Sequence, residues 1–206
     1  MSRRADELEK AERAKSDAEQ REIYANQARN MVKKILDVFR KRYFEEENAD
    51  SVYMHRVTLF VCRDSNGCPD QEKRLEIFAR SGVFEASKCS WPLDDNDPKK
   101  CRGIAAQIWF STNGARMVAA CDWPELDDPI AKSTYAMSLG IAVAEAEALN
   151  VKSKTFVGAP ILVGGRRWGV LLLDSRKDWP HDKQGKRALL NRYATVIGAA
   201  LEGMAL

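Results

Sequence analysis

The alternation of apolar and polar positions is clearest between Ser153 and Leu173, where it predicts a β-hairpin. Two runs rich in β-branched and large apolar residues, Thr155–Val163 and Trp168–Leu173, flank a Gly-Gly pair at positions 164 and 165. Glycine reaches the positive φ that tight turns require. The second run is apolar on both faces, which predicts a central strand covered on both sides. Pro160 cannot donate a ladder hydrogen bond, so we expect a bulge or an unpaired position in the first strand.

Beyond Trp179-Pro180 the apolar period lengthens to three and four residues, which predicts an amphipathic helix. A buried hairpin followed directly by such a helix indicates a sheet that the helix covers. The stripe consists of Leu189, Leu190, Tyr193, Ala194, Ile197, Ala200, Leu201 and Met204.

The N-terminal segment predicts one long helix, from Ser2 to about Glu47, because it contains neither Gly nor Pro. From Tyr24 onward its apolar residues have the spacing of a coiled-coil seam, and we expect a homodimer through this helix. The alternative is a helix that covers the domain's own sheet. The seam residues are Ala25, Ala28, Val32, Ile35 and Phe39.

Between these two ends, alternation predicts a first strand over His55–Cys62 and a returning strand over Arg74–Arg80. Asp64–Gly67 has the composition of a turn between them. Met117–Cys121 predicts a further short strand. In the returning strand we expect one face to carry Leu75, Ile77 and Ala79.

Two Asp-Pro pairs predict helix starts, because aspartate caps a helix and proline suits the first helical position. The pair at Asp97 predicts a helix that stops at Asn113-Gly114, and the pair at Asp128 predicts one over Ile130–Leu139, ended by Gly140. Ala and Glu favour another short helix near Ala144–Leu149. The buried face of the first helix would carry Cys101, Ile104, Ala105 and Ile108.

The proline-containing strand, the turn, Trp168–Leu171, Asp174-Ser175 and a closing helix that ends at Ala199–Glu202 resemble the C-terminal half of a GAF domain. Gly103–Trp109 resembles the family's first inner helix. The resemblance covers roughly Ser51 to Met204. It implies an α/β (α+β) fold, with a central antiparallel sheet, helices on both faces and a preceding long helix. The expected organisation is a dimerising helix over residues 1–50 and a GAF-like domain over residues 51–206.

Composition excludes several functional classes. A chain of 206 residues has room for one domain of about 150 residues and an extension. Its net charge of +3 is too small to favour nucleic acid as a partner. No apolar run is long enough for a membrane span, and the N-terminus lacks the apolar core of a signal peptide, so we expect a cytoplasmic protein.

The five cysteines are an odd number without a CxxC pair, and with only two histidines they offer no zinc pattern. One branch of the GAF family reduces free methionine sulfoxide with cysteines near the inner pocket, and this thiol oxidoreductase is the alternative function. That branch has a cysteine in its first inner helix where this chain has Ala105. It has another just before the strand equivalent to Phe156–Val163, where this chain has none.

The expected function is a non-catalytic sensory or regulatory domain that takes part in signal transduction through its N-terminal helix. It would bind a small molecule, a partner protein or both. The family includes cyclic-nucleotide, tetrapyrrole, haem and small-metabolite sensors, so the resemblance specifies no ligand or cofactor. Large aromatics serve binding sites and cores alike. The candidate pocket residues, in segments that wall the pocket in the family, are Trp91, Trp109, Cys121, Trp123 and Phe156.

Overall fold

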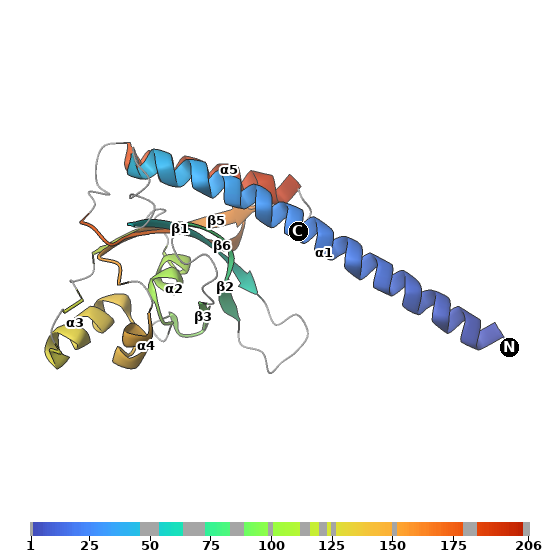
Figure 1. Cartoon of the computed structure of the whole chain (residues 1–206), viewed down its shortest axis with the longest axis horizontal. Coiled ribbons are helices and arrows are strands. Elements are labelled where there is room, and N and C mark those ends of the chain that lie inside the picture. The colour runs from blue at the N-terminus through green and yellow to red at the C-terminus, as the bar shows by residue number, and fades with distance from the viewer. Residues whose placement is uncertain are drawn as a thin grey trace.

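The computed structural model describes residues 2–45, 54–63, 73–82, 89–98, 101–111, 116–119, 123–124, 127–149, 152–178 and 185–203. The strands of these segments form one antiparallel sheet in the order β3-β2-β1-β6-β5-β4. Two helices cover one face of the sheet, and three shorter helices lie on the other side (Figure 1). The predicted α+β fold, with its long N-terminal helix, is therefore confirmed. The strands are β1 (His55–Arg63), β2 (Arg74–Gly82), β3 (Ser90–Pro92), β4 (Arg116–Ala119), β5 (Thr155–Val163) and β6 (Arg166–Ser175).

The predicted hairpin is confirmed as β5 and β6. Gly164 and Gly165 form its turn with φ of 55° and 76°, the left-handed region that glycine enters without steric cost. Pro160 is paired with Val170 on β6, and among the described residues the pairing of β5 with β4 ends at Gly158.

A β-bulge corrects the predicted face of β2. Leu59 on β1 is opposite Ala79, but the next residue, Phe60, is opposite Ile77, so Phe78 is inserted without a partner. The insertion turns both Phe78 and Ala79 toward the long helices, whereas Ile77 packs on the opposite face. The sequence prediction of one face for Leu75, Ile77 and Ala79 was wrong because an extra residue reverses the alternation.

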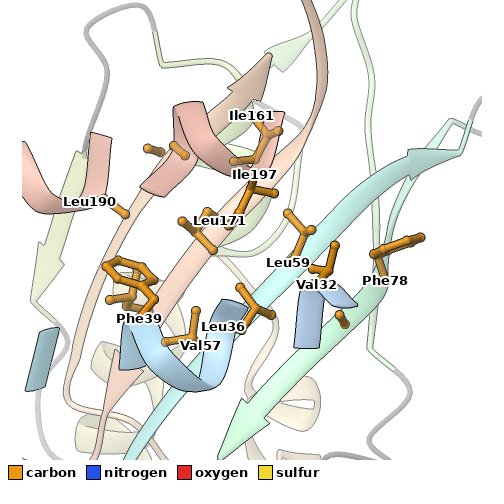
Figure 2. Packing of buried hydrophobic residues seen from close by; sticks show 14 of the residues in the cluster. Val32, Leu36, Phe39, Val57, Leu59, Phe78, Ile161, Leu171, Leu190 and Ile197 are labelled. Carbon is orange, nitrogen blue, oxygen red and sulfur yellow. The ribbon is translucent and has the colours of Figure 1, made fainter. Parts of the chain in front are cut away.

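The helices α1 (Ser2–Phe44) and α5 (Lys186–Gly203) lie side by side on one face of the sheet. Their apolar side chains meet those of β1, β5 and β6 in one core (Figure 2). Val32 and Phe39, two residues of the predicted coiled-coil seam, are fully buried in this core. The C-terminal half of α1 therefore covers the chain's own sheet, which was the alternative interpretation. The N-terminal half of α1 extends beyond the edge of the sheet (Figure 1).

On the other side lie α2 (Ile104–Trp109), α3 (Pro129–Leu139) and α4 (Val143–Ala148). The cap signals of α3 are confirmed. Asp128 accepts hydrogen bonds from the backbone N–H groups of Ile130 and Ala131, at 2.9 and 3.1 Å, and Gly140 ends the helix in the left-handed conformation. The similar signal at Asp97-Pro98 was misleading, because Gly103 has a φ of 82° that an α-helix cannot continue, and α2 begins only after it.

Two glycines permit close packing, and one of them does so differently from expectation. A glycine in a central strand predicts that another element approaches it closely, and at Gly169 that element is a strand rather than a helix: a Cβ there would lie 2.1 Å from the carbonyl oxygen of Phe60 on the neighbouring strand β1. The helix contact occurs instead at Gly198 of α5, where a Cβ would lie 2.2 Å from the carbonyl oxygen of Leu162 on β5. Glycine at position 198 therefore sets the distance between α5 and the sheet.

Candidate functional site

A cavity of about 80 Å³ lies between the sheet and the short helices. A single water needs roughly 10–15 Å³ in the same measure, so the cavity is large enough for a small organic molecule. Most of its lining is apolar, and the polar groups gather at one end of the floor formed by β2, β1 and β6. It is lined by Arg56, Thr58, Phe60, Arg80, Cys89, Trp91, Gly103, Ile104, Ala105, Leu139, Ile141, Leu149, Phe156, Leu172 and Asp174.

Strand alternation places the polar floor residues. On β1, Arg56, Thr58 and Phe60 point to the cavity, while the residues between them enter the helix-side core. Register then brings Arg80 of β2 opposite Thr58, and Asp174 of β6 opposite Arg56. Three adjacent strands thus each contribute a charged side chain to one corner of the cavity.

An ion pair fixes the Asp174 carboxylate, which is only 2% exposed. Arg56 donates to both carboxylate oxygens through Nε at 3.1 and 3.0 Å, and its Nη2 lies 2.8 Å from Oδ1. The Ser153 hydroxyl donates to the same Oδ1 at 2.5 Å, and the Tyr135 hydroxyl donates to the Ser153 carbonyl at 3.0 Å. A buried carboxylate is stable with such partners, and this one is already well satisfied.

The second guanidinium belongs to Arg80, which is 6% exposed. Its Nε donates to Thr58 Oγ1 at 2.9 Å. Burial, and then the charge of Arg56, lower the pKa of Arg80 to about 10, whereas Asp174 acts in the opposite direction. The protein therefore keeps two cationic groups together in a poorly solvated corner.

The wall opposite the sheet depends on close packing between Trp91 and Gly103. Trp91 on the edge strand β3 lies against this glycine so closely that a Cβ would be 2.7 Å from the indole ring. Cys89, two residues before Trp91, also lines the cavity. Burial raises the pKa of the Cys89 thiol, although Arg80 and Arg56 act to lower it. A thiol with a raised pKa is a poor nucleophile at neutral pH.

The structure brings together two of the five residues that the sequence singled out. Trp91 and Phe156 line the cavity. Trp109 is buried in the surrounding apolar cluster, with Lys73 Nζ 5.3 Å from its ring, and is not part of the lining. Trp123 is half-buried and packs edge-to-face on Tyr135. Cys121 lies outside the described residues.

Sequence reasoning missed the charged residues of the cavity floor. The signal was present, because Arg56 shares a face with buried Phe60, and Asp174 directly follows a run that is apolar on both faces. A charged residue within a buried strand pattern is uncommon unless it has a partner, and that rarity marks a candidate site.

Next to each charged residue of the cavity floor stands a residue that faces away from the cavity. Ser81, which follows Arg80, accepts from Arg40 Nε of α1 at 2.8 Å and donates to the Asp37 carboxylate. His55, which precedes Arg56, stacks on Phe44 of α1 with ring centroids 4.0 Å apart. His55 Nδ1 also forms a hydrogen bond, 3.0 Å long, with Oγ of Ser175, which follows Asp174.

The match to a protein family agrees with this architecture. The GAF domain model matches residues 50–201, and the chain belongs to the GAF domain family. No curated protein matches the chain in sequence. Within the segments that the structure describes, no helix is long and apolar enough to cross a bilayer, and no three side chains gather as metal ligands.

Solved structures share the fold at low sequence identity. One is a GAF domain region from Geobacter sulfurreducens PCA, 14% identical with a TM-score of 0.52, and the match covers 89% of this chain and 98% of that chain. Another is the free methionine-R-sulfoxide reductase from Neisseria meningitidis in complex with its substrate, 17% identical with a TM-score of 0.50. That match covers 89% of this chain and 81% of the reductase chain. At these identities the likeness concerns the fold alone.

Proposed function

We propose that this GAF domain is a non-catalytic sensory module that binds a small ligand in the cavity and passes the change to its N-terminal helix. One observation carries the proposal: the charged corner of the cavity and two contacts with α1 are made by adjacent residues of β1 and β2. Ser81, next to Arg80, binds Asp37 and Arg40, and His55, next to Arg56, stacks on Phe44. The cavity corner and the α1 contacts share the backbone of these strands, so a shift caused by a ligand on one face of the sheet would move the residues that contact α1 on the other.

The clearest route runs through β2. A ligand that binds Arg80 would shift the backbone of β2, which also carries Ser81. The Ser81 hydroxyl is hydrogen-bonded to Arg40 and Asp37 of α1, so the shift would reach this helix. Arg40 is 3% exposed, so its guanidinium cannot exchange this partner for water without cost. The contact is therefore a two-sided anchor between the sensing strand and the helix.

A metabolite screen by thermal shift, followed by hydrogen exchange, tests the proposal. We expect a hit to raise the melting temperature and to slow amide exchange in residues 36–44 as well as around the cavity. Ser81→Ala should retain binding but lose most of the change in α1, because the anchor is gone. Ser90→Ala is the matched control, since it removes a similar bond, Arg74 Nε to Ser90 Oγ at 2.8 Å, in an exposed pair. Binding without any change in α1 of the parent would refute signalling through this helix.

We further propose that the chain forms a homodimer through α1, on a different face from the predicted seam. Tyr24, Met31 and Val38 are exposed and spaced by seven residues, the repeat of a coiled coil. Met31→Glu with Val38→Glu should give a monomer by light scattering while the fold is retained. The same test at Val32 would be uninformative, because that residue is buried in the core. A parent protein that is already monomeric at high concentration would exclude the dimer.

A thiol oxidoreductase is the second candidate, favoured by the position of Cys89 on the cavity wall. The raised pKa of this thiol argues against it, because the thiolate is the reactive form. NADPH-coupled reduction of free methionine sulfoxide, assayed with parent and Cys89→Ser, decides between the two. Activity that depends on Cys89 would replace the sensory proposal. The free thiols of Cys62, Cys89 and Cys101 suit the reducing cytoplasm, where we place the protein.

A further inference from the structure

We infer that the cavity is selective for an uncharged small molecule that carries a carbonyl oxygen on an apolar body, and that Thr58 and Arg56 of β1 donate to this oxygen. The inference rests on the proposed ligand-binding function and specifies the chemical class of its ligand. It follows from two donors that no protein acceptor uses, from charged groups that already have protein partners, and from the apolar walls.

The first donor is the hydroxyl of Thr58, which lines the cavity and is only 1% exposed. Its oxygen accepts a hydrogen bond from Arg80 Nε at 2.9 Å. Its own proton has no acceptor among the residues that the structure describes. A buried hydroxyl group is costly to leave without a hydrogen-bond partner, so this position favours a ligand atom that accepts.

The second donor is Nη1 of Arg56, a residue that also lines the cavity. The Nε and Nη2 atoms of this guanidinium face the Asp174 carboxylate, whereas Nη1 donates to no acceptor within the described segments. Arg56 and Thr58 are two residues apart on β1, so their side chains stand next to each other on the same face of the sheet. A carbonyl oxygen has two lone pairs and can accept from both.

The charged groups of the cavity already have protein partners, which favours an uncharged ligand. Asp174 accepts from Arg56 and Ser153. Arg80 is engaged by Thr58 and by a further interaction, so its charge creates no demand for an anion. A ligand anion would meet the buried Asp174 carboxylate, and a ligand cation would meet two guanidinium groups. An uncharged ligand avoids both and loses less hydration on entry.

The remaining walls require an apolar body on the ligand. Away from the polar floor, the lining consists mainly of aromatic and aliphatic side chains, among them Trp91 of β3, Phe156 of β5 and Leu172 of β6. The volume of about 80 Å³ is several times the roughly 10–15 Å³ that one water needs, so the body can hold several carbon atoms. Burial of apolar surface then favours a ring or a short chain over a carbonyl compound as small as acetone.

Thr58 also connects such a ligand to the proposed route of signalling. A hydroxyl group that donates to the ligand becomes a better acceptor, because hydrogen bonds in a chain polarise one another. The bond that Thr58 accepts from Arg80 joins β1 to β2. Ligand binding should therefore tighten the contact between these strands next to Ser81, which holds α1.

The test compares matched probes on the parent protein, with dissociation constants from ligand-observed NMR at neutral pH. Acetophenone, propiophenone and cyclohexanone supply the carbonyl oxygen. Benzoate, benzylamine and ethylbenzene are the matches that carry an anion, a cation and no acceptor. We expect at least one ketone to bind, and acetophenone to bind at least about tenfold more tightly than benzoate or benzylamine, because a charge must leave water to enter the cavity.

Ethylbenzene separates hydrogen bonding from apolar burial. A cavity without donors would favour ethylbenzene, since acetophenone would give up its hydrogen bonds to water without replacement. We expect acetophenone to bind at least as tightly as ethylbenzene, because the two β1 donors replace those bonds.

Variants of Thr58 then locate the first donor. Thr58→Val should weaken the binding of acetophenone by about 5- to 10-fold and leave ethylbenzene unchanged, because it removes the hydroxyl but keeps the shape of the side chain. Thr58→Ser should restore the affinity. Thr134→Val is the matched control, since the Thr134 hydroxyl is exposed and absent from the lining.

A variant of Arg56 tests the second donor. Arg56→Lys keeps a cation beside Asp174 but removes Nη1, so it should weaken acetophenone by about the same factor. Arg63→Lys is the matched control, because Arg63 is an exposed arginine of the same strand and is absent from the lining.

The carbonyl stretch of isotope-labelled acetophenone reports the hydrogen bonds directly by infrared difference spectroscopy. Hydrogen bonding to the oxygen lowers the frequency of this stretch. We expect the frequency in the complex with the parent protein to lie close to that in water, and to rise toward that in an alkane with Thr58→Val.

The outcomes separate the ligand class from the proposed function. If benzoate, benzylamine or ethylbenzene binds more tightly than acetophenone, or if only charged metabolites of the thermal-shift screen bind in the cavity, the carbonyl class is overturned and the sensory function stands. Ketone binding that neither Thr58→Val nor Arg56→Lys weakens would overturn the assigned donors and the inference with them. If no probe and no compound of the screen binds, both the inference and the sensory function are overturned. The comparison among probes needs no variant, so it decides even if Thr58→Val fails to fold.

Discussion

Leu171 and Leu172 are neighbours on β6, yet they face two different halves of the molecule. Leu171 points to the core beneath α1 and α5, where long helices and strands interdigitate (Figure 2). Leu172 lines the cavity beneath the short helices. The same strands thus support a filled core on one face and a hollow on the other, and the difference lies in what covers them.

One face of the sheet is rigidly packed, and the other leaves room for a binding cavity. Long helices present continuous apolar stripes that fill a face, whereas α2 and α4 have only six residues each and cannot do so. The cavity between the sheet and these short helices remains unfilled. The charged residues of its floor are buried there, on the face opposite the core beneath α1 and α5. A rigid scaffold with function on its shorter, looser side is the usual arrangement for binding sites.

The largest effect should come from truncating the two leucines in parallel. Leu171→Ala should cost about 3–5 kcal/mol, because the residue is fully buried in a filled core. Leu172→Ala should cost about 2–3 kcal/mol, because its side chain already borders an empty volume and loses fewer contacts. Chemical denaturation of both variants measures the difference. Equal costs would show that the two faces are packed alike.

Acid should weaken the helix side through His55, which is 4% exposed. Burial, helped by the charges of Lys177 and Arg40, lowers the pKa of His55 to about 4, against 6.5 when unfolded. The unfolded chain binds more protons between these values, so stability should fall by up to about 3 kcal/mol as the pH drops from 6.5 to 4. His55→Gln should flatten this part of the profile of unfolding free energy against pH. An unchanged slope in the variant would assign the effect to other groups.

Gly169→Val should cost about 1–3 kcal/mol, because the new side chain would press on the β1 backbone at Phe60. The effect differs from a helix clash, since it should separate β1 from β6 and disturb both faces together. Thermal unfolding gives the cost, and Gly203→Ala, at an open position at the end of α5 where φ is not positive, is a control for loss of glycine without a clash. A melting temperature equal to that of the parent would contradict the close approach.

The smallest effect should come from the helix cap on the cavity side. Asp128→Ala should cost about 1 kcal/mol, because it removes the acceptor for two backbone N–H groups of α3. Asp127→Ala should cost less, although it breaks an ion pair to Lys132 at 2.5 Å, because that carboxylate is exposed to solvent. Denaturant midpoints of the two neighbours rank the cap against the salt bridge. The reverse order would mean that the ion pair holds this end of α3.

Local patterns predicted most of the fold. The Gly-Gly turn between two apolar runs placed β5 and β6, Asp128 and Gly140 bounded α3, and the period of the last segment placed α5. These signals are local because turn conformation, capping and amphipathicity each depend on a few neighbouring residues. They failed where a single residue overrode the pattern, as with the bulge at Phe78 and the positive φ of Gly103.

The sequence by itself determined most of the strands and helices, because those follow from period and turn chemistry, but it predicted neither β3 nor the start of α2. Only the tertiary structure decided that Arg56, Arg80 and Asp174 meet in one corner, since their meeting depends on the register between three strands that are far apart in the chain. It also decided the use of the N-terminal helix. The apolar stripe of α1 fits a partner helix or a sheet equally well, and the chain's own sheet is present at the higher effective concentration.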